Sequence, residues 1–321
     1  MLPAERAICR VGTLDTLIQQ LINGVMLGSI YALIALGYTM VYGILRIINF
    51  AHGDILMVGS LTTLSGLNLL NGYFPAMPQL LQLGFALLIA MAVERFAYRR
   101  LRHAPRLAPL ISGIGVSVLL QTVAMIIWTR NPLMFPQILP IDPIAITAGS
   151  EAHPPAIVTV TGMVTVALAL IVMTGLWLLV EYTRLGRGMR AVAENPRVAT
   201  LMGVNPNAII TLTFAIGGIF AALAGVMMAS NYGNASFSMG FLPGIKAFTA
   251  AVLGGIGNIR GAMIGGILLG IIEALGAGYL GELTDGVFGS NYQDVFAFIV
   301  LILVLVFSPA GLLGERVAHR A

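Results

Sequence analysis

Apolar residues along this chain are gathered into long blocks, and polar residues fall mainly in the short stretches between them. A helix needs roughly 20 predominantly apolar residues to cross a bilayer, and most blocks approach or exceed that length. The pattern therefore predicts an all-α, polytopic transmembrane helix bundle of about eight or nine spans. The expected spans are residues 17–44, 54–70, 79–97, 109–129, 157–180, 208–230, 241–256, 259–280 and 292–312.

Glycines interrupt two parts of this pattern. The first block is long for one span, so a break is expected near Gly37 or Gly43. Gly254, Gly255 and Gly257 separate the seventh and eighth blocks, which form either a tight hairpin or one broken helix. Small residues also recur at four-residue spacing, which is typical of closely packed transmembrane helices and of helices that slide between two arrangements. These rows are Gly24 and Gly28; Gly217, Ala221 and Gly225; Gly257, Gly261 and Gly265; and Gly266, Gly270, Ala274 and Gly278.

Composition places the chain in the membrane class. Hydrophobic residues make up 58% of the 321 positions and charged residues 9%, whereas a typical soluble domain carries about 25% charged residues. So few charges do not cover a water-exposed surface. The net charge of +4 is explained by membrane orientation rather than by an anionic partner, so no nucleic-acid partner is expected.

Basic residues mark two loops as cytoplasmic, because cytoplasmic loops of membrane proteins are enriched in lysine and arginine. These are Arg95, Arg99, Arg100, Arg102 and Arg106 after the third span, and Arg184, Arg187, Arg190 and Arg197 after the fifth. The Pro-rich stretch 130–156, which cannot be one continuous helix, and the acidic stretch 281–294 then lie outside. Residues 1–16 are expected to be an external tail rather than a signal peptide, and residues 315–321 an internal one. These loop assignments agree with one another only if residues 241–280 cross the membrane, or dip in and out of it, twice. This requirement favours a hairpin of the seventh and eighth blocks over one broken helix.

The second basic loop, residues 181–207, carries the signals of a short capped helix. Asn195 followed by Pro196 is a helix N-cap and first-turn pair, and Gly203 is a natural C-terminal stop. The signals predict a helix of about two turns over 196–202, preceded by another helical turn over 188–194. The next span starts with a second Asn-Pro pair.

Three apolar residues of this helix, Val198, Leu201 and Met202, have no domain to cover them. A solvated connecting loop would not need deliberate capping or exposed apolar side chains. A helix that docks its apolar face into a groove on a partner explains both. The residues expected to serve this contact are Arg187, Arg190, Glu194, Asn195, Pro196, Val198, Leu201, Met202 and Gly203.

Three ionisable residues, Asp54, Lys246 and Glu273, fall at membrane depth, where charges are costly and often functional. For Asp54, a role as helix cap is favoured over a role in a pathway. Glu273 lies roughly 20 Å along its helix from the glycine turn and either lines an outward-facing cavity or pairs with Lys246. The candidate translocation residues are Asn49, His52, Asp54, Lys246, Gly254, Gly255, Gly257 and Glu273.

Motifs for catalysis are not found in the sequence. Lys246 is the only lysine and is followed by Ala247, whereas a phosphate-binding loop requires Gly-Lys-Ser/Thr. The four histidines show no metal-ligand spacing, and no nucleophile elbow is present. We therefore expect a non-catalytic chain with no catalytic residue, metal or cofactor of its own.

Four stretches resemble the H-type (LivH-type) permease of branched-chain amino acid ABC importers. They are 28–54, 111–115, 190–195 and 246–257, and the resemblance extends from about residue 16 to 314, which includes the expected transmembrane domain, 17–314. It implies a bacterial inner-membrane subunit that imports leucine, isoleucine and valine. It also implies as partners an M-type permease, two cytoplasmic ATP-binding subunits that hydrolyse ATP, and a periplasmic amino-acid-binding protein. Residues 188–203 would then touch an ATPase.

Other functions stay open. Related permeases for urea and short amides share the Asn-x-Ala-His-Gly turn, and other amino acids are possible substrates. A secondary transporter or channel would need an ion-coupling cluster in the spans. The sequence provides only three candidate residues for it, Asp54, Lys246 and Glu273. A structural or signalling protein would need a sensory or output domain. No obvious charge pair to grip a zwitterion is evident, so substrate selection is expected mainly in the binding protein.

Overall fold

The structure, a computed structural model, describes residues 3–73, 107–137, 141–147, 155–283, 292–308 and 311–314. In these ranges the chain is a helical bundle with four two-residue strands. The helices are α1 (Pro3–Leu45), α2 (His52–Tyr73), α5 (Leu107–Ile127), α6 (Val160–Tyr182), α7 (Arg184–Glu194), α8 (Pro196–Leu201), α9 (Pro206–Tyr232), α10 (Phe241–Gly254), α11 (Ile259–Leu283) and α12 (Gln293–Phe307). The strands are β1 (Leu133–Met134), β2 (Ile144–Ala145), β3 (Ile157–Val158) and β4 (Asn234–Ala235), paired antiparallel as β1–β4 and β2–β3.

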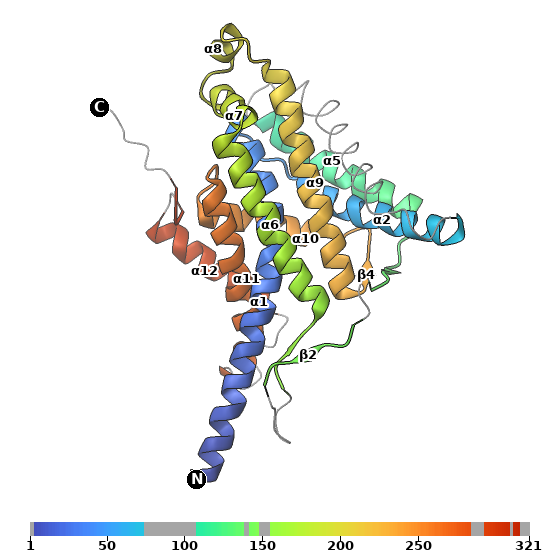
Figure 1. Cartoon of the computed structure of the whole chain (residues 1–321), viewed down its shortest axis with the longest axis vertical. Helices are drawn as coiled ribbons and strands as arrows, with labels where there is room; N and C mark the ends of the chain where they lie inside the picture. The colour runs from blue at the N-terminus through green and yellow to red at the C-terminus, as the bar shows by residue number, and fades with distance from the viewer. Residues whose placement is uncertain are drawn as a thin grey trace.

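Helix α1 forms the axis of the bundle, and α11 packs along it (Figure 1). The middle of α1, residues 30–36, is almost fully buried. A Cβ atom on Gly28 would lie 2.7 Å from the Cα atom of Ile267, closer than real Cβ atoms approach. Only glycine therefore lets the two backbones come this near, and small residues of both helices form the contact.

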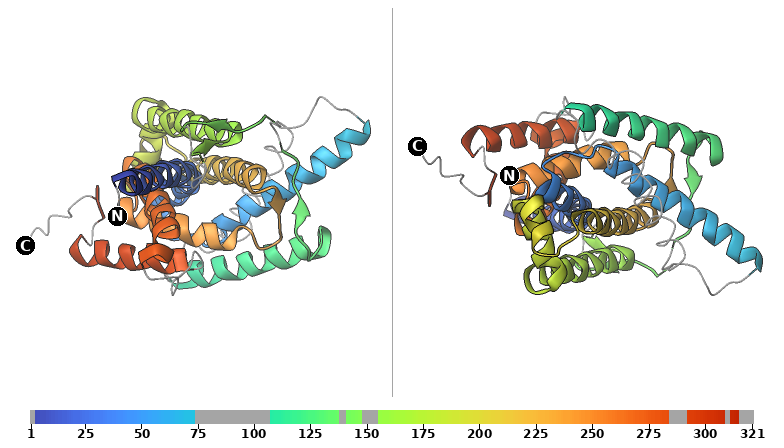
Figure 2. Two further views of the ribbon diagram at one scale, coloured as in Figure 1. Left: turned by 90° about the horizontal axis from the view of Figure 1, so that it is seen from below. Right: turned by 90° about the horizontal axis from the view of Figure 1, so that it is seen from above.

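The remaining helices surround this pair. Seen end on, α6 lies on one side of the bundle, and α5 and α12 lie on the other (Figure 2). Helix α9 packs against both α1 and α2, and α10 packs against α11. Helices α7 and α8 lie at the end of the molecule opposite the N-terminus (Figure 1).

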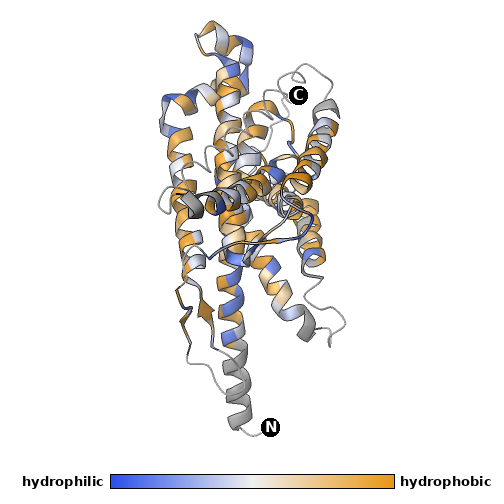
Figure 3. Cartoon of the chain, turned by 90° about the vertical axis from the view of Figure 1, so that its right-hand side faces the viewer, coloured by the Kyte–Doolittle hydropathy of each residue, from blue (hydrophilic) through white to orange (hydrophobic). Residues whose placement is uncertain are grey.

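Four of the described helices are long and apolar enough to cross a membrane. They cover Leu14–Leu45, Val160–Tyr182, Pro206–Tyr232 and Ile259–Tyr279. Apolar residues follow the bundle, whereas polar residues are frequent around α7 and α8 (Figure 3). The count of eight or nine spans stays a prediction, because the span expected at 79–97 lies outside the described residues. The same holds for the basic residues between 95 and 106 and for the tail 315–321.

One expectation about the start of the chain, the break near Gly37 or Gly43, is wrong. Helix α1 continues without a break through Gly37 and Gly43. The His52 ring occupies the space that a side chain on Gly37 would fill, so this glycine serves close packing and not a break. Residues expected to form a tail are helical from Pro3 onward. The Pro-rich stretch 130–156 contains short strands and no helix in its described part, as predicted.

A glycine turn separates α10 from α11. Gly255 and Gly257 have φ angles of 104° and 95°, in a region that side-chain-bearing residues rarely adopt. The segment after α12 is bonded to this turn, because the backbone N–H groups of Leu312 and Leu313 donate to the carbonyls of Leu253 and Gly254 at 2.8 and 3.0 Å. The turn and residues 311–314 therefore form one unit.

Candidate functional site

A buried charge cluster joins four helices. The Nζ atom of Lys246 on α10 lies 2.6 Å from Oε1 of Glu273 on α11 and 2.6 Å from Oδ1 of Asp294 on α12. The Tyr31 hydroxyl of α1 donates a hydrogen bond of 3.0 Å to Oε2 of Glu273. One ammonium group therefore bridges two carboxylates, and the second oxygen of the inner carboxylate is also bonded.

The two carboxylates differ in burial. The side chains of Lys246 and Glu273 are 7% and 3% exposed, whereas that of Asp294 is 29% exposed. Buried charges are costly unless they are paired, and two carboxylates against one ammonium leave a net charge of −1. The inner pair is closed from solvent, and Asp294 connects the cluster to the surface.

A second polar group surrounds the start of α2. Oδ1 of Asp54 accepts a hydrogen bond of 2.9 Å from Nε2 of Gln121 on α5, and the same amide nitrogen lies 3.3 Å from the Ser117 hydroxyl. The cap predicted for Asp54 is wrong, because its side chain turns toward α5 instead of toward its own backbone. Asn49 performs the local bonding, since its Oδ1 accepts from the N–H of Ala51 at 3.1 Å.

Helices α7 and α8 follow the predicted capping. The Asn195 side chain accepts from the N–H groups of Arg197 and Val198 at 3.0 and 3.2 Å and starts α8, with Pro196 in its first turn. Gly203 has a φ angle of 82° and lies just past the helix end. Helix α7 is longer than the single turn expected, since Thr183 caps it at residue 184.

The apolar face of α8 points away from the bundle. Val198, Leu201 and Met202 are 52%, 86% and 79% exposed, whereas Ala199 is buried. Apolar side chains this exposed are favourable to bury, at roughly 1.5–3 kcal/mol for a full leucine or methionine side chain. The tip of α8 therefore offers a small apolar contact surface at one end of the molecule.

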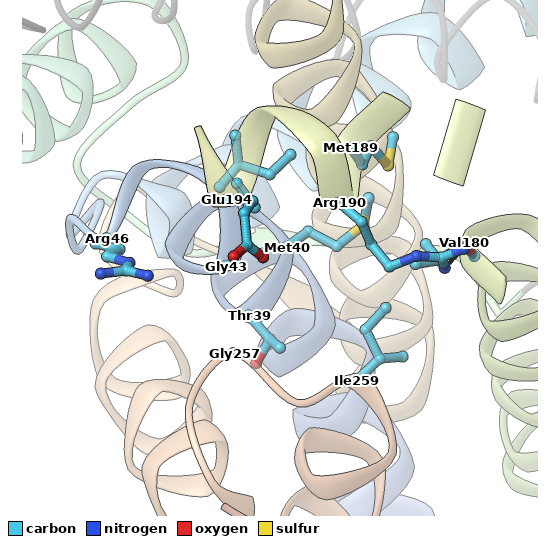
Figure 4. A pocket seen from close by; sticks show the side chains of 12 residues that line it. Thr39, Met40, Gly43, Arg46, Val180, Met189, Arg190, Glu194, Gly257 and Ile259 are labelled. Atoms are coloured by element: carbon cyan, nitrogen blue, oxygen red, sulfur yellow. Dashed lines mark hydrogen bonds between the residues drawn. The ribbon is translucent and has the colours of Figure 1, made fainter. Parts of the chain in front are cut away.

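A cleft lies beneath α7. Its volume is about 350 Å³, and its walls come from α1, α6, α7 and the glycine turn (Figure 4). Arg190 bonds back to the end of α6, where its guanidinium donates to the carbonyls of Val180 and Glu181. Glu194 lines the cleft opposite the end of α1. A wider space of about 950 Å³ adjoins it and shares Gly257, so α7, α1 and the α10–α11 turn line one continuous hollow.

Residues 20–305 match the family model described as the branched-chain amino acid transport system / permease component. The chain belongs to this permease family. Family membership and the apolar helices together make it a multi-pass membrane protein. Among the residues that the structure describes, the permease has no group of three or more His, Cys, Asp or Glu side chains that would hold a metal ion.

Two named relatives of the permease match nearly its whole length, and a third matches part of it. The high-affinity branched-chain amino acid transport system permease protein BraD of Pseudomonas aeruginosa is 45% identical over 93% of this chain and 96% of its own. The corresponding protein LivH of Escherichia coli K12 is 42% identical with the same coverage. The galactose/methyl galactoside import permease protein MglC of E. coli K12 is 32% identical over 35% of each chain.

The structure divides the predicted site residues of the permease into separate groups. Those on α7 and α8 lie at one end, and Gly257 lines the hollow beneath α7, whereas Gly254 and Gly255 pack against Gly261 and Gly314. Lys246 and Glu273 meet each other but not Asp54. Sequence reasoning missed three participants, namely Asp294, Tyr31 and Gln121. The only sequence feature that could have indicated a role for Asp294 is its position as an acidic residue at the start of an apolar stretch.

Proposed function

We propose that this chain is the permease subunit of an ATP-driven ABC importer that carries leucine, isoleucine and valine across the bacterial inner membrane. Its partners in this proposal are a second, M-type permease, two cytoplasmic ATP-binding subunits and a periplasmic amino-acid-binding protein. The substrate is the one for which relatives at 42–45% identity over 93% of the chain are named. ATP hydrolysis is assigned to the partner subunits.

The capped helix α8 is the observation on which the proposed coupling rests. Leu201 and Met202 lie three and four residues after Val198, so the three side chains share one face of the helix. That face is exposed and apolar, as expected for a helix that docks into a groove on a partner. In the proposal, this face enters an ATP-binding subunit on the cytoplasmic side.

Helix α7 is the proposed link from α8 to the membrane-spanning bundle. Its buried residues Gly188, Met189 and Val192 pack inward, while Arg190 bonds to the end of α6. The hollow beneath it leaves room for α7 to move toward α1 and the glycine turn. A push on α8 would thus be transmitted to α1 and α11, whose closely packed backbones line the bundle axis.

Uptake by the reconstituted transporter tests this function. In proteoliposomes that contain all partner subunits, we expect ATP-driven leucine uptake against a gradient. Leu201→Asp should lower uptake about tenfold or more, because it removes an apolar contact and buries a carboxylate. Thr200→Asp is the matched control, since it adds the same charge to the same helix away from that face.

Three results would contradict the proposal. The first is concentrative uptake without the ATP-binding subunits, which would indicate a secondary transporter. The second is full uptake and full co-purification of the ATP-binding subunits with Leu201→Asp. A solitary, stable oligomer of this chain after purification from its native membrane would argue the same way.

A further inference from the structure

The two ion pairs of Lys246 are not equivalent. Glu273 is 2% exposed and also accepts the Tyr31 hydroxyl, so it stays bonded if Lys246 shifts. Asp294 is 29% exposed and is the second residue of α12. The Lys246–Asp294 pair can therefore open without leaving a fully buried carboxylate unpaired, because Asp294 is partly exposed.

An α-amino acid has the charges needed to enter this pair. Its carboxylate accepts hydrogen bonds from an ammonium group, and its ammonium donates to a carboxylate. Inserting a zwitterion between Lys246 and Asp294 leaves the net charge of the cluster unchanged and pairs every charge. A lone anion or a lone cation would pair only one half of the opened site.

We propose that Lys246 and Asp294 form a recognition site for zwitterionic amino acids, in which Lys246 binds the α-carboxylate and Asp294 the α-ammonium. Glu273 and Tyr31 hold Lys246 in position. The inference rests on the proposed function, because it requires an amino acid to pass this chain. Glu273 lies 14 residues past the start of α11, so about 21 Å along that helix from the glycine turn. The site is therefore far from the cleft beneath α7, on the side where imported substrate would enter.

Helix α12 leads from this site toward the glycine turn. Its 15 residues span about 22 Å, and the segment after it is bonded to Leu253 and Gly254 beside the glycine turn. Gly257 of that turn lines the cleft beneath α7. When substrate separates Asp294 from Lys246, α12 is displaced. This displacement reaches the glycine turn, which borders the cleft beneath α7.

Binding of radiolabelled leucine to the complete transporter in lipid nanodiscs, without the periplasmic binding protein, tests the site. Asp294→Asn should weaken leucine binding about 10- to 100-fold, the effect of losing one hydrogen bond to a charged group. Asp294→Glu keeps the carboxylate and should retain most of the binding. Asp142→Asn alters an exposed carboxylate elsewhere and should leave binding unchanged.

Competition separates recognition from a purely structural role. In the unaltered complex, 4-methylpentanoate, which lacks the ammonium, and 3-methylbutylamine, which lacks the carboxylate, should displace leucine poorly. With Asp294→Asn, the preference for leucine over 4-methylpentanoate should shrink, since the partner of the ammonium has been lost. A structural ion pair would lower stability and leave this preference unaltered.

Three outcomes would overturn the inference. One is equal leucine binding by the unaltered and Asp294→Asn complexes, both eluting as intact assemblies. Another is an unchanged preference between the two ligands in the variant. The third is no leucine binding by a complex that takes up leucine once the binding protein is added, and this outcome leaves the proposed function standing. If no amino acid is taken up with every partner present, the proposed function falls and the inference falls with it.

Discussion

Replacing Lys246 by methionine removes the ammonium group from the buried cluster and keeps a flexible apolar side chain in its place. Glu273 then retains only the Tyr31 hydroxyl, at 2% exposure, and faces Asp294 with no cation between them. Breaking a buried ion pair by removing one partner costs about 3–5 kcal/mol, and we expect a loss of this size for Lys246→Met. The control is Arg184→Met, which alters an exposed residue and should change stability by less than about 0.5 kcal/mol.

A double-mutant cycle determines whether the loss arises from the pair. Glu273→Gln alone leaves Lys246 paired with Asp294, so its cost should be about 1–3 kcal/mol. In the double variant the buried carboxylate that Lys246→Met leaves unpaired is gone. The combined loss should therefore fall short of the sum by about 0.5–3 kcal/mol. Unfolding in mixed micelles, followed by the fluorescence of the two tryptophans, measures each value. Strict additivity, or a loss below about 1 kcal/mol for Lys246→Met, would refute the reasoning.

Three further perturbations have defined outcomes. Asn195→Ala should cost about 1 kcal/mol of local stability, seen as faster amide exchange in α8 alone; slow exchange there would disprove the cap. Gly28→Leu should separate α1 from α11 and yield a protease-sensitive chain, whereas Gly43→Ala, with its nearest neighbour 3.8 Å away, should fold normally. Arg260→Gln removes a guanidinium 5.0 Å from the Trp177 ring and should cost about 0.5–1 kcal/mol, with a shifted emission spectrum; unchanged emission and stability would contradict it.

The short capped helix in the α7–α8 segment could be predicted from local sequence signals. Asn195, Pro196 and Gly203 each act within one turn of helix, so their effect can be read without knowing the fold. The structure confirms the start of α8, the stop at Gly203 and the exposure of the apolar face. The break expected near Gly37 failed because glycine has two uses in a membrane helix, and only the position of the His52 ring distinguishes them.

The charge cluster was predicted in part for a similar reason. Lys246 and Glu273 can be recognised in the sequence because a charge is rare within an apolar stretch. Their pairing was one of the two roles predicted for Glu273, the other being to line a cavity. Asp294 ends the acidic stretch 281–294, which has the composition of an external loop, and its place beside Lys246 depends on how α12 packs. Asp54 has a local explanation as a cap, but its partner Gln121 lies 67 residues away. Contacts at such separations are set by tertiary packing.

The pairing of α1 with α11 has a consequence for how the chain is made. Tyr31 and Glu273, which the hydrogen bond joins, are 242 residues apart. At a synthesis rate of about 5–20 residues per second, α1 leaves the ribosome roughly 10–50 s before its partner exists. During that interval its glycine-lined face meets lipid or a temporary protein neighbour. A factor that shields this face during biogenesis would protect the nascent chain from premature association with other membrane helices.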